Sequence, residues 1–131
     1  MKILLLVVRL LMGLMFFVFG LNAFLHFIPA QLPPGLAGQF ASILFQSHYL
    51  LFVGGVQVIG GLLLVVNRYM PLALTLLGPV IVNILLFHLL MAPSGVPLAI
   101  LVAVLWVLVF FSVRSAFAGL LQPRVAVPVS R

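Results

Sequence analysis

The sequence predicts an all-α integral membrane protein, a bundle of four membrane-spanning helices with a short amphipathic interfacial helix between the first two spans. The first observation is composition: 66% of the 131 residues are hydrophobic, the mean hydropathy is +1.50 and only 5% are charged. A soluble domain of this length has too little interior for so much apolar side chain, so lipid must be the solvent. The second observation is that four long apolar segments are separated by short segments rich in Pro, Gly or Arg.

The first span is expected over residues 3–28. Its basic start resembles that of a secretory signal peptide, but the apolar stretch after Arg9 is too long for an h-region and no small-x-small cleavage site follows. The run Pro-Ala-Gln-Leu-Pro-Pro-Gly at 29–35 breaks the helix. Residues 36–47 then predict an amphipathic helix in the membrane interface, because apolar residues recur there at helical spacing. These apolar positions are Leu36, Phe40, Ile43 and Leu44.

The other three spans are expected over residues 49–66, 71–91 and 96–113, with Gly78-Pro79 interrupting the third. Together the four spans form one transmembrane domain, residues 1–113. Residues 114–131 carry Arg and Pro at intervals and are expected to form a surface tail, helical at first and then extended.

All of the charged residues are basic, and all fall on one side of this arrangement. They are Lys2, Arg9, Arg68, Arg114, Arg124 and Arg131. The positive-inside rule therefore predicts that both termini are cytoplasmic. The histidines His26, His48 and His88 fall on the other side, at similar depth. Because the basic residues are scattered singly and form no basic face, the pI near 11.8 indicates anionic lipid headgroups as a partner and no nucleic acid.

Two absences limit the chemistry that the chain can perform. The sequence contains no Cys, which excludes a disulfide, a thiol relay, an iron–sulfur cluster and an attached c-type haem. It contains no Asp or Glu, which excludes a carboxylate general base and a carboxylate cage for hard cations. The polar side chains that remain suit holding a neutral polar ligand better than breaking bonds, and whether the chain is an enzyme stays open.

Small residues on the first two spans predict close helix packing. In the second span Gly54, Gly60 and Gly61 lie within about 60° of Gln57, at roughly 100° per residue. Small residues let helices approach, and a buried amide can hydrogen-bond across the contact, so all four positions are assigned to packing. A ligand contact is the alternative for Gln57. The corresponding small residues of the first span are Gly13 and Gly20.

The candidate ligand site combines polar residues of the first and third spans. Asn22 and His26 are four apart and share a helical face, and His88 lies near the outer end of the third span. Asn83 and His88 do not share a face of a regular helix, and a structural hydrogen bond is the favoured role for Asn83. Asn83 joins the set because Gly78-Pro79 can change its angular relation to His88. We expect His26 and His88 to face one outer-leaflet cavity, with Asn22 nearby.

A quinone headgroup fits this set of side chains, because it needs only hydrogen-bond partners for its two carbonyls inside an apolar slot. A metal or haem fits poorly, because no acidic partner and no recognisable ligand spacing accompany the histidines. The alternative for each histidine, His48 included, is placement at headgroup depth with no ligand.

Three stretches resemble the DoxX-like family of small four-helix bacterial membrane proteins. The first runs from Arg9-Leu-Leu-Met-Gly-Leu-Met to Asn22. The second runs from Gly54-Gly-Val-Gln-Val-Ile-Gly-Gly to Asn67-Arg68. The third runs from Pro71-Leu-Ala-Leu through Gly78-Pro-Val-Ile-Val-Asn to His88.

The resemblance implies a four-helix bundle in the bacterial inner membrane and a link to respiratory redox chemistry. Relatives include a membrane subunit of a thiosulfate:quinone oxidoreductase and proteins tied to terminal quinol oxidases. Others are scaffolds for redox enzymes or membrane chaperones, so fold does not fix function. This chain departs from sulfur handling because it has no thiol. The first hypothesis is a quinone- or redox-linked membrane subunit. The alternatives are a non-catalytic scaffold, chaperone or packing subunit of a larger membrane complex or homo-oligomer, and a small-molecule carrier.

Overall fold

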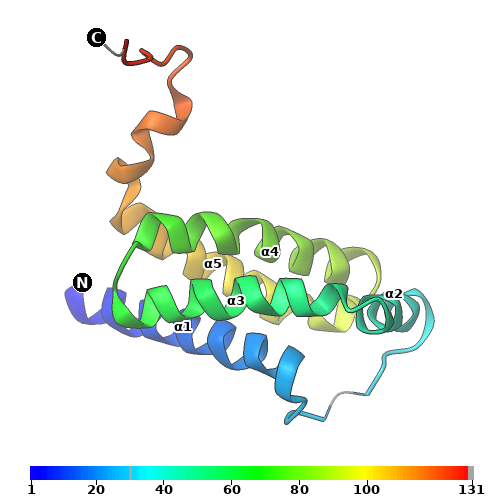
Figure 1. The fold of residues 1–131 in the computed structure, drawn as a ribbon. Helices are drawn as coiled ribbons and strands as arrows, with labels where there is room; N and C mark the ends of the chain where they lie inside the picture. The colour runs from blue at the N-terminus through cyan, green and yellow to red at the C-terminus, as the bar shows by residue number, and fades with distance from the viewer. Residues whose placement is uncertain (30, 130–131) are drawn as a thin grey trace.

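The computed structural model describes residues 1–29 and 31–129, and within them it confirms the predicted all-α bundle with a crosswise helix between the first two spans (Figure 1). Four helical segments are long and apolar enough to cross a membrane: Lys2–Leu25, Tyr49–Val66, Met70–Leu90 and Pro93–Ser112. The elements in order are α1 (Lys2–Leu25), α2 (Gly35–Gln46), α3 (Tyr49–Val66), α4 (Met70–Leu90), η1 (Pro93–Gly95), α5 (Val96–Ser112) and η2 (Arg114–Leu121).

The first span ends at Leu25, earlier than the expected end at residue 28. His26 adopts the left-handed conformation with φ 51°, and its backbone N–H donates to the Asn22 carbonyl. The Asn22 side chain then accepts a hydrogen bond of 2.7 Å from the Ile28 backbone N–H. The Asn22 side chain therefore orders the chain that leaves α1, because it accepts a hydrogen bond from the backbone N–H of Ile28, just before Pro29.

Glycines bring α1 and α3 together, backbone against backbone. A Cβ added to Gly61 would lie 2.5 Å from the Phe17 nitrogen and 2.6 Å from the Gly13 carbonyl oxygen. Two helical turns away on α3, a Cβ on Gly54 would lie 2.5 Å from the Ala23 Cβ. The opposing Gly20 would meet the Gly54 carbonyl oxygen at 2.7 Å. Because these glycines recur at a spacing of seven on both antiparallel helices, we call this contact the glycine seam.

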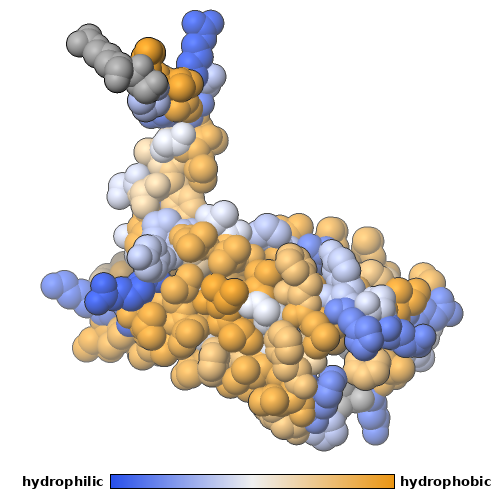
Figure 2. All heavy atoms as spheres, viewed as in Figure 1, coloured by the Kyte–Doolittle hydropathy of each residue, from blue (hydrophilic) through white to orange (hydrophobic). Residues whose placement is uncertain are grey.

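The remaining core is made by larger side chains from all four spans. Those that are fully buried are Met12, Leu64, Leu74, Leu77 and Val109. On the α4–α5 side, the Trp106 indole donates a 3.0 Å hydrogen bond to the Leu74 carbonyl and stacks on Phe110 at 5.3 Å between ring centroids. Apolar side chains also cover the outside of the bundle, while hydrophilic residues gather at its two ends (Figure 2). This distribution is the one that a lipid environment requires.

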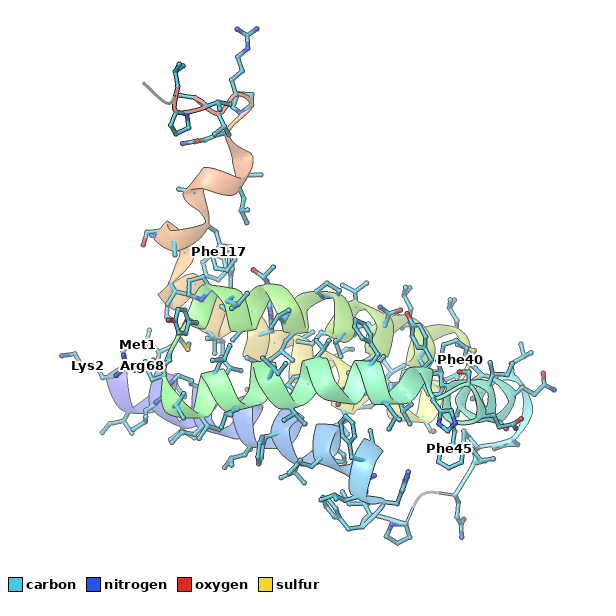
Figure 3. The ribbon with its side chains drawn as sticks, in the orientation of Figure 1. Met1, Lys2, Phe40, Phe45, Arg68 and Phe117 are labelled. Atoms are coloured by element: carbon cyan, nitrogen blue, oxygen red, sulfur yellow. The ribbon has the colours of Figure 1, made fainter. Side chains whose placement is uncertain are left out.

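At one end of the bundle, Arg9 closes the contact between α1 and α3. Its guanidinium donates to the Leu64 carbonyl and, at 3.0 Å, to the Val65 carbonyl. The last carbonyls of a helix have no partner within the helix, and they attract positive charge, so Arg9 caps α3 from a neighbouring span. Met1, Lys2 and Arg68 lie at this same end, which we call the basic end (Figure 3). Arg131 lies outside the described residues.

Helix α2 lies across the opposite end of the bundle, crosswise to the spans (Figure 1). Its Phe40 packs against Phe87 of α4 at 5.9 Å between ring centroids. The tail leaves the basic end crosswise to the spans as the 3-10 helix η2. Phe117 anchors it against Phe110 at 5.0 Å between centroids (Figure 3). The two crosswise segments thus lie at opposite ends of the bundle, where membrane interfaces are expected.

Candidate functional site

A cavity of about 130 Å³ lies inside the bundle, and all four spans contribute to its wall. Its apolar lining consists of Met15, Phe16, Phe19, Ile84, Leu98, Ala99 and Val102. Its polar lining consists of Gln57 from α3 and His88 from α4. An apolar cavity with a few convergent polar groups is the usual form of a small-molecule site. We call it the central cavity.

His88 is held in one orientation by the turn that follows α4. Its Nδ1 lies 3.2 Å from the Ala92 carbonyl oxygen, and a carbonyl only accepts, so Nδ1 carries the proton in this contact. In the neutral ring, Nε2 is then a hydrogen-bond acceptor. The ring also lies directly against Gly95, where an added Cβ would come within 2.2 Å of Nδ1. Only a residue without a side chain leaves this space for the imidazole.

Gln57 lies in the middle of α3 and is half-buried beside Gly20 of α1. Within residues 1–29 and 31–129, its amide takes part in none of the side-chain hydrogen bonds. The amide can donate two hydrogen bonds and accept two. The central cavity is therefore flanked by an amide with free hydrogen-bonding capacity and an imidazole with one nitrogen available.

A second, larger cavity of about 400 Å³ lies at the end where α2 crosses the bundle. Its lining comes from the end of α1, the end of α2 and the start of α3: Ala23, Phe24, His26, Phe45, Gln46, His48, Leu50 and Leu51. His26 contacts Phe45 edge-on at 5.6 Å between ring centroids. We call this the outer cavity. His26 and His48 are both exposed, and both have left-handed backbones, with φ 51° and φ 61°.

The expectation of a single pocket shared by His26 and His88 is wrong. His88 lines the central cavity, whereas His26 lines the outer cavity together with His48. The physical reason is that α1 ends before residue 26, and the left-handed turn there directs the ring toward α2. Asn22 accepts a hydrogen bond from the loop backbone and lines neither cavity.

Asn83 also lies away from both cavities. It is exposed on the outside of α4, and its Nδ2 donates a 2.8 Å hydrogen bond to the Pro79 carbonyl. The regular helix angle between residues 83 and 88 already separated the two side chains, and Pro79 does not bring them together. Of the four candidate ligand residues, the structure thus places only His88 in the central cavity.

Two features of the cavities differ from the assignments that the sequence favours. For Gln57 the sequence favours packing, with a ligand contact as the alternative, and the residue both lines the central cavity and lies beside the glycine seam. His48 and Gln46 were given no ligand role, yet they line the outer cavity with His26. The sequence feature that indicates a ligand role for Gln57 is an amide side chain in the middle of an apolar span, where lipid offers it no hydrogen-bond partner.

The matched family model is the DoxX domain, and it covers residues 4–89. The chain belongs to the DoxX family. The comparisons with curated proteins and with solved structures gave no match. The DoxX match extends from α1 to the penultimate residue of α4, so it includes Gln57 and His88. It ends before α5, which supplies Leu98, Ala99 and Val102 to the central cavity.

Proposed function

We propose that this DoxX-family membrane protein is a quinone-linked subunit that holds a quinone-type ring in the central cavity. The observation that carries the proposal is the pairing of Gln57 and His88 across an otherwise apolar cavity enclosed by four membrane-spanning helices. Burying polar groups at membrane depth costs free energy. Residues that carry such groups there are therefore functional candidates by default.

The size of the central cavity supports a single planar ring. Its volume is about 130 Å³. An engineered apolar cavity of roughly 150 Å³ in another protein binds benzene. Phe19 and Leu98, which line the cavity from α1 and α5, are 54% and 57% exposed on the bundle surface. The cavity therefore adjoins lipid between these two helices, which gives an apolar tail on the ring a lateral exit.

The hydrogen-bonding groups match both oxidation states of such a ligand. The Gln57 amide donates to a carbonyl oxygen or accepts from a hydroxyl. The Nε2 of neutral His88 accepts from a hydroxyl, and a protonated His88 donates to a carbonyl. A bound quinone supplies reversible two-electron, two-proton chemistry. The residues of this chain bind and orient the ring, exclude water from it and offer a proton acceptor at Nε2.

The test is ligand retention after purification in mild detergent from quinone-containing membranes. Lipids are extracted and quantified by mass spectrometry for wild type, Gln57→Leu, His88→Leu and the control His26→Leu. We expect both central-cavity variants to retain about tenfold less quinone, the effect of losing roughly 1.4 kcal/mol of binding. The control should retain the wild-type amount. A wild-type protein that carries no quinone, or a central-cavity variant that keeps it, contradicts the proposal.

The orientation of the protein is part of the same proposal. With Lys2, Arg9 and Arg68 at the basic end, the positive-inside rule supports cytoplasmic termini and an outer position for α2. The central cavity then lies toward the outer leaflet, because His88 is in the last turn of α4.

A further inference from the structure

We infer that α4 carries a self-association surface through which two copies of this chain pair in the membrane. This α4 face is built from exposed residues at helical spacing on the outside of the helix. They are Leu72, Thr75, Pro79, Val82, Asn83 and Leu86. No described element covers the outer side of α4 in Figure 1. The inference is independent of the proposed quinone site.

The α4 face carries the polar side chain of Asn83 at a depth where lipid cannot form hydrogen bonds. Asn83 is exposed, and its single hydrogen bond within the described residues runs from Nδ2 to the Pro79 carbonyl. Its Oδ1 and its second N–H are left without a partner there. In hydrocarbon, neither group has water to turn to. An asparagine in this position therefore favours contact with another protein over contact with lipid.

Pro79 leaves a second group on the same face without its regular helical partner. Proline has no backbone N–H, so it cannot donate to the carbonyl of residue 75, four positions earlier in α4. The Thr75 hydroxyl does not compensate, because it donates to the Pro71 carbonyl at 2.8 Å. Thr75, Pro79 and Asn83 are spaced four apart, so the two polar sites lie along one side of the helix.

A second copy of the chain is the partner that this pattern fits. A carboxamide both donates and accepts, so two Asn83 side chains can satisfy each other across a two-fold axis. When that axis runs along the membrane normal, identical residues meet at identical depth without any further matching. Val82 and Leu86 then supply apolar packing on either side of the amide pair. A partner of different sequence could satisfy the Asn83 amide only if it happened to carry a polar group at the same depth in the membrane.

The surface is separate from the central cavity. Ile84 and His88, the residues of α4 that line that cavity, lie about 100° and 140° around the helix from Asn83. Pairing through Asn83 therefore leaves both cavity residues in place. A failure of pairing does not affect quinone retention, and a failure of quinone retention does not affect pairing.

Cysteine cross-linking in native membranes tests the surface directly, because the chain has no cysteine of its own. Val82→Cys and Leu86→Cys are compared with Leu14→Cys on α1 and Leu101→Cys on α5, which are exposed at other faces. Under mild oxidation we expect disulfide-linked dimers of this chain for the two α4 variants alone. Equal cross-linking at all four positions, no cross-linking, or cross-linking to a different protein overturns the inference.

Asn83 itself is tested by the dimer fraction in bilayer nanodiscs or by single-molecule photobleaching. We expect Asn83→Leu to reduce dimerisation about tenfold, the effect expected when roughly 1.4 kcal/mol of pairing is lost. Asn83→Gln should retain most of it, because it keeps the amide. A monomeric wild type, or an Asn83→Leu variant as dimeric as wild type, overturns the inference. If Asn83→Leu does not fold, the cross-linking positions decide the question.

Discussion

The glycine seam and the central cavity are two solutions to packing helices in lipid, and α3 takes part in both. At the seam, Gly54 and Gly61 bring the α3 backbone against α1, and a single added carbon has no space. At the central cavity, side chains from four helices leave about 130 Å³ unfilled beside Gln57. Close packing supplies stability at the first, and at the second an unfilled, largely apolar space with two polar side chains forms the proposed ligand site. Substitutions in the two regions should therefore have separable effects.

The largest effect on stability is expected at the seam. Gly61→Leu forces a side chain toward the Phe17 backbone, which cannot move without parting α1 from α3, and overpacking of this kind costs about 3 kcal/mol. Thermal unfolding in detergent should show a clearly lower Tm.

The matched pair for this position is Gly61→Ala and Gly55→Ala. A Cβ on Gly55 would meet only Phe24, at 3.9 Å, so alanine fits there. We expect Gly61→Ala to lower the Tm and Gly55→Ala to leave it unchanged or higher, since alanine favours the helix by up to about 1 kcal/mol. Equal Tm values for the two variants refute the close contact.

The next effect concerns the cap on α3 at the basic end. Arg9→Met removes both hydrogen bonds to the Leu64 and Val65 carbonyls. A hydrogen bond to a charged group contributes about 1.5–3 kcal/mol to the free energy of unfolding. Because water and headgroups reach this end, we expect a net loss of about 2 kcal/mol, read out as a lower Tm. Arg9→Lys should recover part of it, since a point charge lacks the planar fork of donors. A Tm unchanged in Arg9→Met argues against the cap.

A smaller stability effect with a large effect on the ligand is expected at Gly95. In Gly95→Ala the new methyl group occupies the position of the His88 ring and breaks its contact with Ala92, at a cost of about 1 kcal/mol. We expect retained quinone to fall as in His88→Leu, although His88 is still present. The neighbouring exposed Ser94→Ala is the control. Full quinone retention in Gly95→Ala contradicts the role assigned to the ring orientation.

Two cysteine substitutions are expected to leave stability unchanged, and together they test which end of the bundle faces outward. Ser94→Cys lies at the histidine end of the bundle and Gln122→Cys in the tail, and both positions are exposed. An impermeant thiol reagent added to intact cells should label Ser94→Cys, whereas Gln122→Cys should react only after lysis. The reverse pattern refutes the proposed orientation.

Composition and periodicity predicted the fold because they depend on local sequence. The second span was expected over residues 49–66 and α3 runs over Tyr49–Val66, and the apolar spacing from Leu36 to Leu44 predicted α2. The end of α1 was misplaced because the hydrogen bond from Ile28 to the Asn22 side chain follows from the path of the loop, which hydropathy does not encode.

The candidate site was predicted less well because it depends on how each helix is rotated. The glycine seam sets the rotation of α3 against α1, and that rotation decides that Gln57 lines the central cavity. The position of His26 depends on a left-handed turn and on Phe45 of α2, neither of which a single-span pattern reveals. His88 lies in the last turn of α4, near the end of its span as the sequence predicts, whereas Gln57 lines the cavity although the sequence favours packing for it.

The most direct test of the central cavity uses the single tryptophan of the chain. Trp106 lies one helical turn from Val102, which lines the cavity, so a quinone ring bound there should quench its fluorescence. Titration of the purified protein with a short-chain quinone should give saturable quenching in wild type and in the control His26→Leu. In Gln57→Leu and His88→Leu it should give only a weak, non-saturating decrease from quinone dissolved in the detergent. Saturable quenching of the same strength in all four proteins, or none in wild type, would contradict a ligand site formed by Gln57 and His88.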